Sequence, residues 1–197
     1  MQESIHFLSQ KDEVLKTIIA DFGLPIIQKR EEGFASMCHI ILEQQVSIAS
    51  AKAAYEKLVN LVGKVDPFNI SNATDQDLRT CGISRQKTLY LKDLARRVIN
   101  KELSFSSLPM KTEQQIRKEL IQIKGVGNWS IDVYLMFCMQ SQDIIPLGDI
   151  AIKNTLMELY NCKSEEEMLA ISSNWKRFRT LASFIIWHYY LNKRGKI

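Results

Sequence analysis

The chain has 197 residues, of which 46% are hydrophobic and 24% charged, and its formal net charge is +4. This length supports one sizeable core or two small lobes, and the composition excludes a disordered or fibrous chain. The mild positive charge permits a nucleic-acid partner without requiring one. The first residues, MQESIHFLSQKDEV, hold no apolar signal core, and no apolar run reaches the ~18 residues of a membrane helix. We therefore expect no membrane partner, and a location in a bacterial cytoplasm or a eukaryotic nucleus.

The hydrophobic pattern predicts helices along almost the whole chain. Apolar residues recur at steps of three and four, as at Ile48, Ala51, Tyr55 and Leu58. Strand-like alternation is absent over any useful length. About ten helices are predicted, at roughly 11–22, 34–46, 48–62, 74–81, 85–100, 112–121, 128–140, 149–160, 164–171 and 175–192.

Side chains that cap helices support several of these starts. Thr112 with Gln115, and Ser164 with Glu167, match the capping box, in which two side chains satisfy each other's backbone N–H groups. Four further positions carry breaks or caps and are consistent with the predicted boundaries: Thr74 and Ser84 as N-caps, and Gly63 and Asp66-Pro67 as helix ends.

The four cysteines do not have the spacing of metal ligands. Cys38, Cys81, Cys138 and Cys162 are spread along the chain, whereas zinc and iron–sulfur sites use closely spaced cysteines. Cys38 and Cys138 have apolar neighbours and are expected to act as small core residues. We expect no iron–sulfur cluster, no cofactor for catalysis and a reducing compartment.

The most informative segment is Leu120–Asp149, LIQIKGVGNWSIDVYLMFCMQSQDIIPLGD. Gly125 and Gly127 allow backbone conformations that turn N–H groups outward just before a helix. Outward N–H groups and a helix N-terminus together form an anion site, and a phosphate is the obvious guest. Glycine is also common in plain helix–turn–helix corners, so the two glycines alone leave both interpretations open.

A single acid ends the same segment. Asp149 follows Pro146-Leu147-Gly148 at a predicted helix start. A rigid carboxylate suits cleavage of a glycosidic bond, because it stabilises positive charge on the sugar and orients the attacking water. An N-cap is the common role of Asp at such a position, and it remains the alternative. The rival acids are Asp132, expected to face solvent or a basic neighbour, and Asp143, expected to be solvated.

Residues 120–149 resemble the helix-hairpin-helix and Gly/Pro-rich loop–aspartate signature of a DNA glycosylase superfamily, and most of all its alkylbase branch, 3-methyladenine DNA glycosylase II. Supporting blocks are Ile41–Ser47, Leu78–Lys87 and Trp175–Trp187. The resemblance implies an all-α, two-lobed fold with the catalytic cleft between the lobes. One lobe is predicted to comprise 1–35 plus 146–197, the other 36–145 with the helix-hairpin-helix at about 112–140. Residues 1–35 are expected to pack as a helix against the C-terminal lobe.

The resemblance also implies roles for individual residues. Asp149 falls on the position of the catalytic carboxylate, and Trp129 and Trp187 on positions that hold a flipped base, with Tyr134 in the same space. Gln45 falls on the wedge that fills the gap in the base stack, and Gln44 precedes it. The implied contacts to DNA phosphate are Lys124, Gly125, Val126, Gly127, Asn128 and Arg179, with Arg85 and Lys87 as further candidates. The backbone carbonyls of Ile121, Ile123 and Val126 are implied to hold Na⁺ or K⁺.

Structural alternatives stand beside several of these roles. Trp187 and Tyr134 fit core packing as well as a base pocket, and the Gln44–Gln45 pair also fits a cap between two helices. His188 and His39 are expected to be structural. Family members that also cut the DNA backbone carry a Lys just after the hairpin, where this chain has Trp129 followed by Ser130. Base removal without strand cleavage is therefore expected.

The sequence thus predicts a monomeric, monofunctional DNA glycosylase of base excision repair. It would bind double-stranded DNA with a damaged base, flip out an alkylated purine such as 3-methyladenine, and hydrolyse its N-glycosidic bond with the help of a carboxylate. A glycosylase for another damaged base is the nearest alternative. A non-catalytic helix-hairpin-helix DNA-binding module, or an interaction domain with incidental charge, are alternatives of a different class.

Overall fold

The computed structural model of the protein describes residues 2–195, which form twelve α-helices and one 3-10 helix and contain no β-strand. The predicted all-α class is confirmed. In chain order the helices are α1 (Gln2–Lys11), α2 (Glu13–Phe22), α3 (Phe34–Glu43), α4 (Ile48–Val62), α5 (Pro67–Asn72), α6 (Asp75–Thr80), α7 (Arg85–Ile99), η1 (Phe105–Met110), α8 (Glu113–Leu120), α9 (Asn128–Phe137), α10 (Ile150–Tyr160), α11 (Glu165–Ser173) and α12 (Arg179–Lys193).

Some elements differ from the predicted helices. The helices α1, α5 and η1 were not predicted. The Asp66-Pro67 pair, interpreted as a helix break, begins α5 instead, because Asp66 accepts the Asn69 N–H and proline suits the first helical position. The last helix, α12, was predicted to begin at residue 175 but begins at Arg179. Arg177 has a left-handed backbone with φ +81°, which a helix cannot include.

All four predicted N-caps are confirmed. Thr112 and Ser164 form complete capping boxes, with Gln115 and Glu167 accepting the return bonds. Thr74 and Ser84 each accept the backbone N–H of the third residue that follows. Thr74 forms a capping box with Asp77 as well, because Asp also supplies a carboxylate that can reach back to the N-cap N–H.

The helices divide into two compact units. One joins the residues up to Lys29 with those from Leu135 onward, and the other comprises Arg30–Tyr134. The predicted lobes, 1–35 plus 146–197 and 36–145, place both boundaries elsewhere and stay a prediction. Met1 and residues 196–197, which belong to the first predicted lobe, lie outside the described residues.

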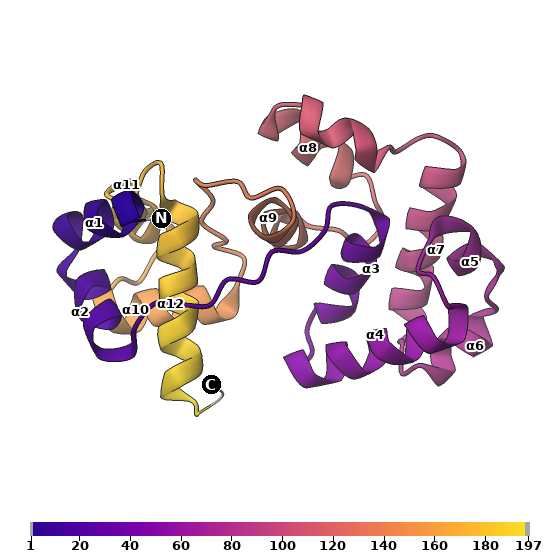
Figure 1. Cartoon of the computed structure of the whole chain (residues 1–197), viewed down its shortest axis with the longest axis horizontal. Coiled ribbons are helices and arrows are strands. Elements are labelled where there is room, and N and C mark those ends of the chain that lie inside the picture. Colours follow the sequence, from indigo (N-terminus) through magenta and orange to yellow (C-terminus); the bar gives the residue numbers. More distant parts are fainter. Residues whose placement is uncertain (1, 196–197) are drawn as a thin grey trace. The chain divides into compact units, whose positions relative to one another are not determined.

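The first unit is built around α12. Helices α1, α2 and α10 pack against it, as Figure 1 shows for the long yellow helix and its neighbours. Its core includes Leu8 and Leu15 from the N-terminal helices and Ile152 and Leu156 from α10, all with 0% exposure. Burial of such a side chain contributes about 1.5–3 kcal/mol. The N-terminal residues therefore pack on the C-terminal segment, as predicted, but as two helices rather than one.

The second unit is built around α7. Helices α3, α5 and α6 pack against it, and α4 packs against α3. The buried face of α7 presents Leu91, Leu94 and Ala95, each with 0% exposure, at the spacing that the hydrophobic pattern predicted. This leaves the other side of α7, which carries Tyr90 and Asp93, to meet the hairpin between α8 and α9.

All four cysteines are buried. Cys38 and Cys138 have 0% exposure, which confirms their predicted core role, and burial raises the pKa of the Cys38 thiol well above its ordinary value. Among residues 2–195, no helix combines the length and apolar character needed to cross a membrane.

Candidate functional site

The glycine segment forms a tight hairpin between α8 and α9. The Ile123 N–H donates to the Leu120 carbonyl at 3.1 Å, and the Val126 N–H donates to the Ile123 carbonyl at 3.0 Å. Ile123 and Val126 are buried at 2% and 5% exposure and anchor the turn, while Gly125 and Gly127 are exposed. The hairpin is therefore held from inside by apolar side chains and presents its glycines to solvent.

Only one of the two glycines is required by geometry. Gly125 has φ +78°, a left-handed conformation that other residues resist. A Cβ atom at this position would lie 2.1 Å from the ring of Tyr90 on α7. At Gly127 the backbone is not left-handed, and a Cβ would meet nothing within 4 Å. The open space at Gly127 leaves room for another molecule to approach the backbone closely.

We expect Gly125→Ala to destabilise the protein by about 2–3 kcal/mol, from left-handed strain of about 1 kcal/mol and the clash with Tyr90. Gly127→Ala is the matched control and should change the stability by less than about 1 kcal/mol. Urea denaturation of both variants measures the difference. Equal stability of the two variants would contradict the geometry of the hairpin.

The segment that follows α3 is tied to the hairpin. The side-chain amide of Gln44 donates to the Gly125 carbonyl and to the Ser130 hydroxyl, both at 2.9 Å. The next residue, Gln45, is exposed and has φ +56°. Gln44 therefore joins the end of α3 to the hairpin and α9, which is the kind of role that the capping alternative gave to the Gln44–Gln45 pair. Gln45 extends from a strained turn. The exposed apolar residues Val46 and Ile48 flank this turn.

The basic candidates differ in how they are engaged. The Lys124 backbone N–H donates to the Asp93 carboxylate at 2.9 Å. The Lys87 ammonium donates to the Leu42 carbonyl at 2.7 Å and is half-buried, so it holds the end of α3 rather than pointing into solvent. Burial also lowers the pKa of Lys87. Arg85 is exposed and forms no ion pair in the described part of the chain.

The helix that follows the hairpin carries three polar or aromatic candidates. Trp129 is half-buried at its first turn. Asp132 is 6% exposed and pairs with Arg117 at 2.7 Å, which is the basic neighbour that its helical position predicted. Burial raises the pKa of Asp132, against the opposing effect of Arg117. Tyr134 is fully buried, and its hydroxyl accepts the Gly33 N–H at 2.9 Å.

The other unit holds Asp149, which caps α10. One carboxylate oxygen, Oδ1, accepts the backbone N–H groups of Ala151 at 2.9 Å and Ile152 at 3.1 Å. The same oxygen accepts the indole N–H of Trp187 at 3.1 Å. The N-cap alternative is therefore confirmed, and it does not exclude a second role, because the residue remains partly exposed. Three donors on one oxygen fix the direction of the carboxylate.

An aromatic cluster surrounds Trp187. Its ring stacks on Phe137 with centroids 6.0 Å apart and lies 5.8 Å from Phe184. Phe137 and Phe184 were not among the predicted site residues. They come from α9 and α12, and no local motif could bring them together with Asp149. Phe184 and Trp187 are three residues apart on α12, and this spacing places them side by side on the helix surface.

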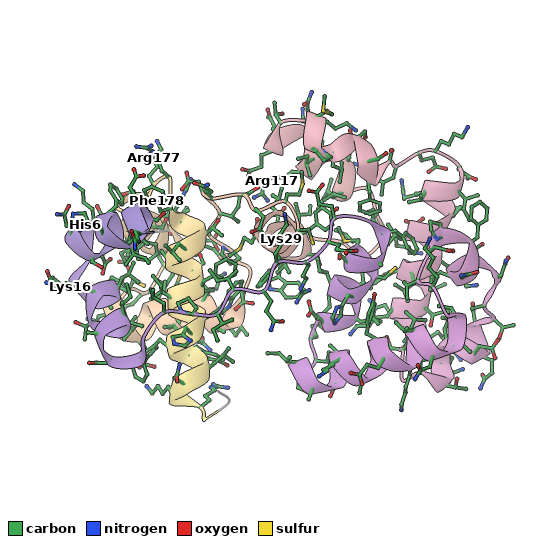
Figure 2. All side chains as sticks on the ribbon, viewed as in Figure 1. His6, Lys16, Lys29, Arg117, Arg177 and Phe178 are labelled. Carbon is green, nitrogen blue, oxygen red and sulfur yellow. The ribbon has the colours of Figure 1, made fainter. Side chains whose placement is uncertain are left out.

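The predicted phosphate contact Arg179 forms a bidentate pair with Asp143. Its guanidinium meets the two carboxylate oxygens at 2.8 Å each, and the Arg177 backbone N–H donates to the same carboxylate at 2.8 Å. The Arg179 guanidinium therefore holds the pKa of Asp143 below its usual range. Figure 2 shows Arg177 beside Phe178 in the loop before α12, where the guanidinium lies 5.8 Å from the ring centroid.

The structure thus brings together two sets of candidates. In the unit Arg30–Tyr134, the hairpin gathers Gln44, Asp93 and Tyr90 around its glycines. In the other unit, Asp149 meets Trp187 and its aromatic neighbours. Along the chain, the helical hairpin with exposed glycines is followed by one capping aspartate, in the order that the sequence resemblance implied.

Comparison with known families agrees with this resemblance. Residues 38–179 match the HhH-GPD superfamily of base excision DNA repair proteins. The chain belongs to this superfamily, which confirms the resemblance identified in the sequence.

Individual relatives are similar at modest identity. The chain is 30% identical over 162 residues to the putative DNA-3-methyladenine glycosylase YfjP of Bacillus subtilis, covering 77% of this chain and 56% of that protein. It is 27% identical over 196 residues to a DNA-3-methyladenine glycosylase of the same organism, covering 91% of this chain and 64% of that protein. The chain therefore spans less than two thirds of the length of either relative.

One solved structure shows how far the fold agrees. The Schizosaccharomyces pombe 3-methyladenine DNA glycosylase, in complex with abasic DNA, superposes with a TM-score of 0.84. The match covers 98% of this chain and 97% of that chain at 22% identity. At this identity the likeness establishes the fold and leaves the chemistry to the residues themselves.

Proposed function

We propose that this protein is a monofunctional DNA glycosylase that excises alkylated purines such as 3-methyladenine from double-stranded DNA, acting as a monomer. The observation that carries the proposal is Asp149, a carboxylate held by three N–H donors at the start of α10 in a chain of the base-excision repair superfamily. The names of its relatives, DNA-3-methyladenine glycosylases, support the alkylated substrate.

In this proposal Asp149 acts on the sugar and on water. As the bond from C1′ to the base nitrogen breaks, its electron pair leaves with the base and positive charge develops on the sugar. The carboxylate stabilises that charge and orients the water whose oxygen bonds to C1′. The departing alkylated purine takes the electron pair and leaves as the neutral base, the water's proton passes to the carboxylate and then to solvent, and an abasic site remains. The donors from Ala151, Ile152 and Trp187 keep the carboxylate from rotating during these steps.

We propose that Trp129 and Trp187 hold the flipped base. An alkylated purine carries positive charge, and aromatic faces attract cations by ~0.5–2 kcal/mol. Trp187 has the better support, because its indole N–H contacts Asp149 and its ring packs on Phe137 and Phe184. A base stacked there would lie close to the carboxylate. The complete burial of Tyr134 favours the packing alternative for that residue.

The hairpin is proposed to bind the DNA backbone. The exposed residues Gly125, Gly127 and Asn128 offer backbone N–H groups, with open space at Gly127, and such contacts position a duplex without reading its sequence. Gln45 is proposed as the wedge, since it extends from a left-handed turn that Gln44 fastens to the hairpin. The neighbouring Val46 and Ile48 are exposed and would add apolar contact to the gap in the base stack.

The hairpin carbonyls fit a monovalent cation in their chemistry. Ile121, Ile123 and Val126 would supply hard oxygen ligands, and the Ile123 oxygen, which accepts one N–H, retains a second lone pair. Such a cation would stiffen the turn and would take no part in the chemistry. Within residues 2–195 no group of three or more His, Cys, Asp or Glu side chains is placed to hold a metal. A protein with this function would be located with the genome, in a bacterial cytoplasm or a eukaryotic nucleus.

The proposal is tested by incubating the protein with methylated duplex DNA and assaying released bases and alkali-labile sites. We expect release of methylated purines and strand breaks only after alkali, because Trp129 and Ser130 stand where a Schiff-base lysine would be needed. Strand breaks without alkali would contradict the absence of lyase chemistry. If the protein binds DNA but releases no base, the catalytic proposal fails and the alternative of a non-catalytic DNA-binding module is supported.

A further inference from the structure

An acid on α7 contacts the hairpin, and the proposed role of the hairpin does not explain it. Asp93, on α7, accepts three hydrogen bonds with its carboxylate. Oδ2 accepts the Lys124 backbone N–H at 2.9 Å and Arg97 Nε at 2.8 Å, and Oδ1 accepts Arg96 Nη2 at 3.0 Å. The side chain is only 16% exposed. A carboxylate therefore lies directly against the backbone of a hairpin that is proposed to bind an anion.

The same helix meets the hairpin at two neighbouring points. Tyr90 lies one turn before Asp93 on α7, and its ring fills the space beneath Gly125. Asp93 holds the preceding N–H, that of Lys124. Because Gly125 is left-handed, the N–H groups of Lys124, Gly125 and Val126 turn toward one side, and that of Val126 is already bound to the Ile123 carbonyl at 3.0 Å. Asp93 occupies the first of these donors, so it determines which N–H groups the hairpin leaves for another anion.

The charge of Asp93 is balanced within its own network. Arg96 and Arg97 both pair with Asp93 and both approach Glu102, so two cations and two carboxylates meet on this side of the unit. Burial alone would raise the pKa of Asp93. The hydrogen bonds from Lys124, Arg97 and Arg96 outweigh it and hold the pKa below its usual range. Asp93 is therefore a charged acceptor whose repulsion of a nearby phosphate is offset by its arginine partners.

We propose that Asp93 is a positioning residue of the hairpin, which draws the Lys124 N–H inward and thereby orients the N–H groups of Gly125, Gly127 and Asn128 toward a DNA phosphate. The inference rests on the proposed DNA-binding function. Because its backbone N–H is bound to Asp93, Lys124 would contact DNA only through its exposed side chain. In this proposal, α7 fixes the conformation of the hairpin before DNA binds.

Two substitutions separate the hydrogen bond from the charge. Asp93→Ala removes the acceptor for the Lys124 N–H. Asp93→Asn keeps an oxygen that can accept this N–H, while its amide nitrogen faces Arg96, whose side chain is 48% exposed. Glu102→Ala is the matched control, because it removes the other carboxylate of the network, which does not contact the hairpin.

The experiment measures binding of each variant to an undamaged DNA duplex over a range of salt concentrations. For Asp93→Ala we expect roughly tenfold weaker binding and a salt dependence shallower by about one unit, since one phosphate contact is lost. Asp93→Asn should bind within about twofold of the unaltered protein, and so should Glu102→Ala. Hydrogen exchange of the Lys124 amide should accelerate in Asp93→Ala and stay slow in Asp93→Asn.

The outcomes distinguish this inference from the proposed function. If the unaltered protein does not bind duplex DNA, the proposed function fails. If it binds and Asp93→Ala binds equally well with an unchanged salt dependence, Asp93 has no positioning role. Equal weakening in Asp93→Ala and Glu102→Ala would also overturn the proposal, because the effect would then come from the charge network and not from the Lys124 N–H.

Discussion

Asp149→Asn should slow the rate of base release by roughly 10²–10⁴-fold. The DNA affinity and the stability of the variant should stay near those of the unaltered protein. The oxygen Oδ1 of Asp149 accepts three N–H groups, and the carbonyl oxygen of Asn can accept the same three. Asn is also a good N-cap, so α10 keeps its start. The substitution therefore removes the negative charge from the site and keeps these three hydrogen bonds. Release of methylated bases under single-turnover conditions measures the effect.

A matched control comes from another capping aspartate. Asp66 accepts the Asn69 N–H at 2.9 Å at the start of α5 and is half-buried like Asp149. Asp66→Asn makes the same chemical change at a helix start that has no proposed role in chemistry, and it should leave base release unchanged. If Asp149→Asn releases bases at the unaltered rate, Asp149 is only a cap and the catalytic proposal fails.

The fold was predictable wherever local physics determines it. Thr112 and Ser164 begin helices because their hydroxyls satisfy N–H groups within the next turn, and that information lies in four consecutive residues. The elements α5 and η1 were not predicted, since each has six residues, too few for a periodic apolar pattern. The helix α6 is equally short and was predicted, because its N-cap Thr74 marks its start. Asp66-Pro67 shows the ambiguity, because the same pair can end one helix or begin another.

The candidate site was predictable only in part. The glycines of the hairpin and the acid at a helix start can be found along the chain, as Gly125 and Asp149 were. Their partners cannot, because Asp93 contacts Lys124 across 31 positions and Trp187 contacts Asp149 across 38. Asp93 was not singled out, since an acid on a basic helix suits ordinary ion pairs with residues three and four positions on. Only the packing of α7 against the hairpin gives it a further role.

Asp12→Ala should lower the free energy of unfolding by about 3–5 kcal/mol, the largest stability effect expected here. Asp12 is 9% exposed and accepts the N–H groups of Val14 and Leu15 at the start of α2. It also accepts the indole N–H of Trp175 at 2.7 Å and the hydroxyl of Tyr160 at 2.9 Å. Alanine removes the cap and leaves two largely buried donors without an acceptor. Urea denaturation measures the loss, which is large against a typical total of about 5–15 kcal/mol.

Tyr160→Phe is the control for this network. It removes one donor and leaves Asp12 with its cap and with Trp175, so it should cost only about 1 kcal/mol. The pKa of Tyr160 is raised by burial and by the Asp12 carboxylate, which keeps the hydroxyl a donor over the whole working range of pH. A loss below about 1 kcal/mol in Asp12→Ala would contradict the network.

The Asp12 network also separates stability from chemistry in the same unit. Tyr160 is the last residue of α10, and Asp149 caps the first turn of that helix. At temperatures below its unfolding transition, Asp12→Ala keeps the hydrogen bond between Trp187 and Asp149 and should release bases at the unaltered rate. Its activity should be lost at a lower temperature than that of the unaltered protein, because the variant unfolds earlier. Asp149→Asn should show the reverse, an unchanged transition and no release. A slow rate in folded Asp12→Ala would mean that the placement of α10, and not only the presence of its capping carboxylate, controls the reaction.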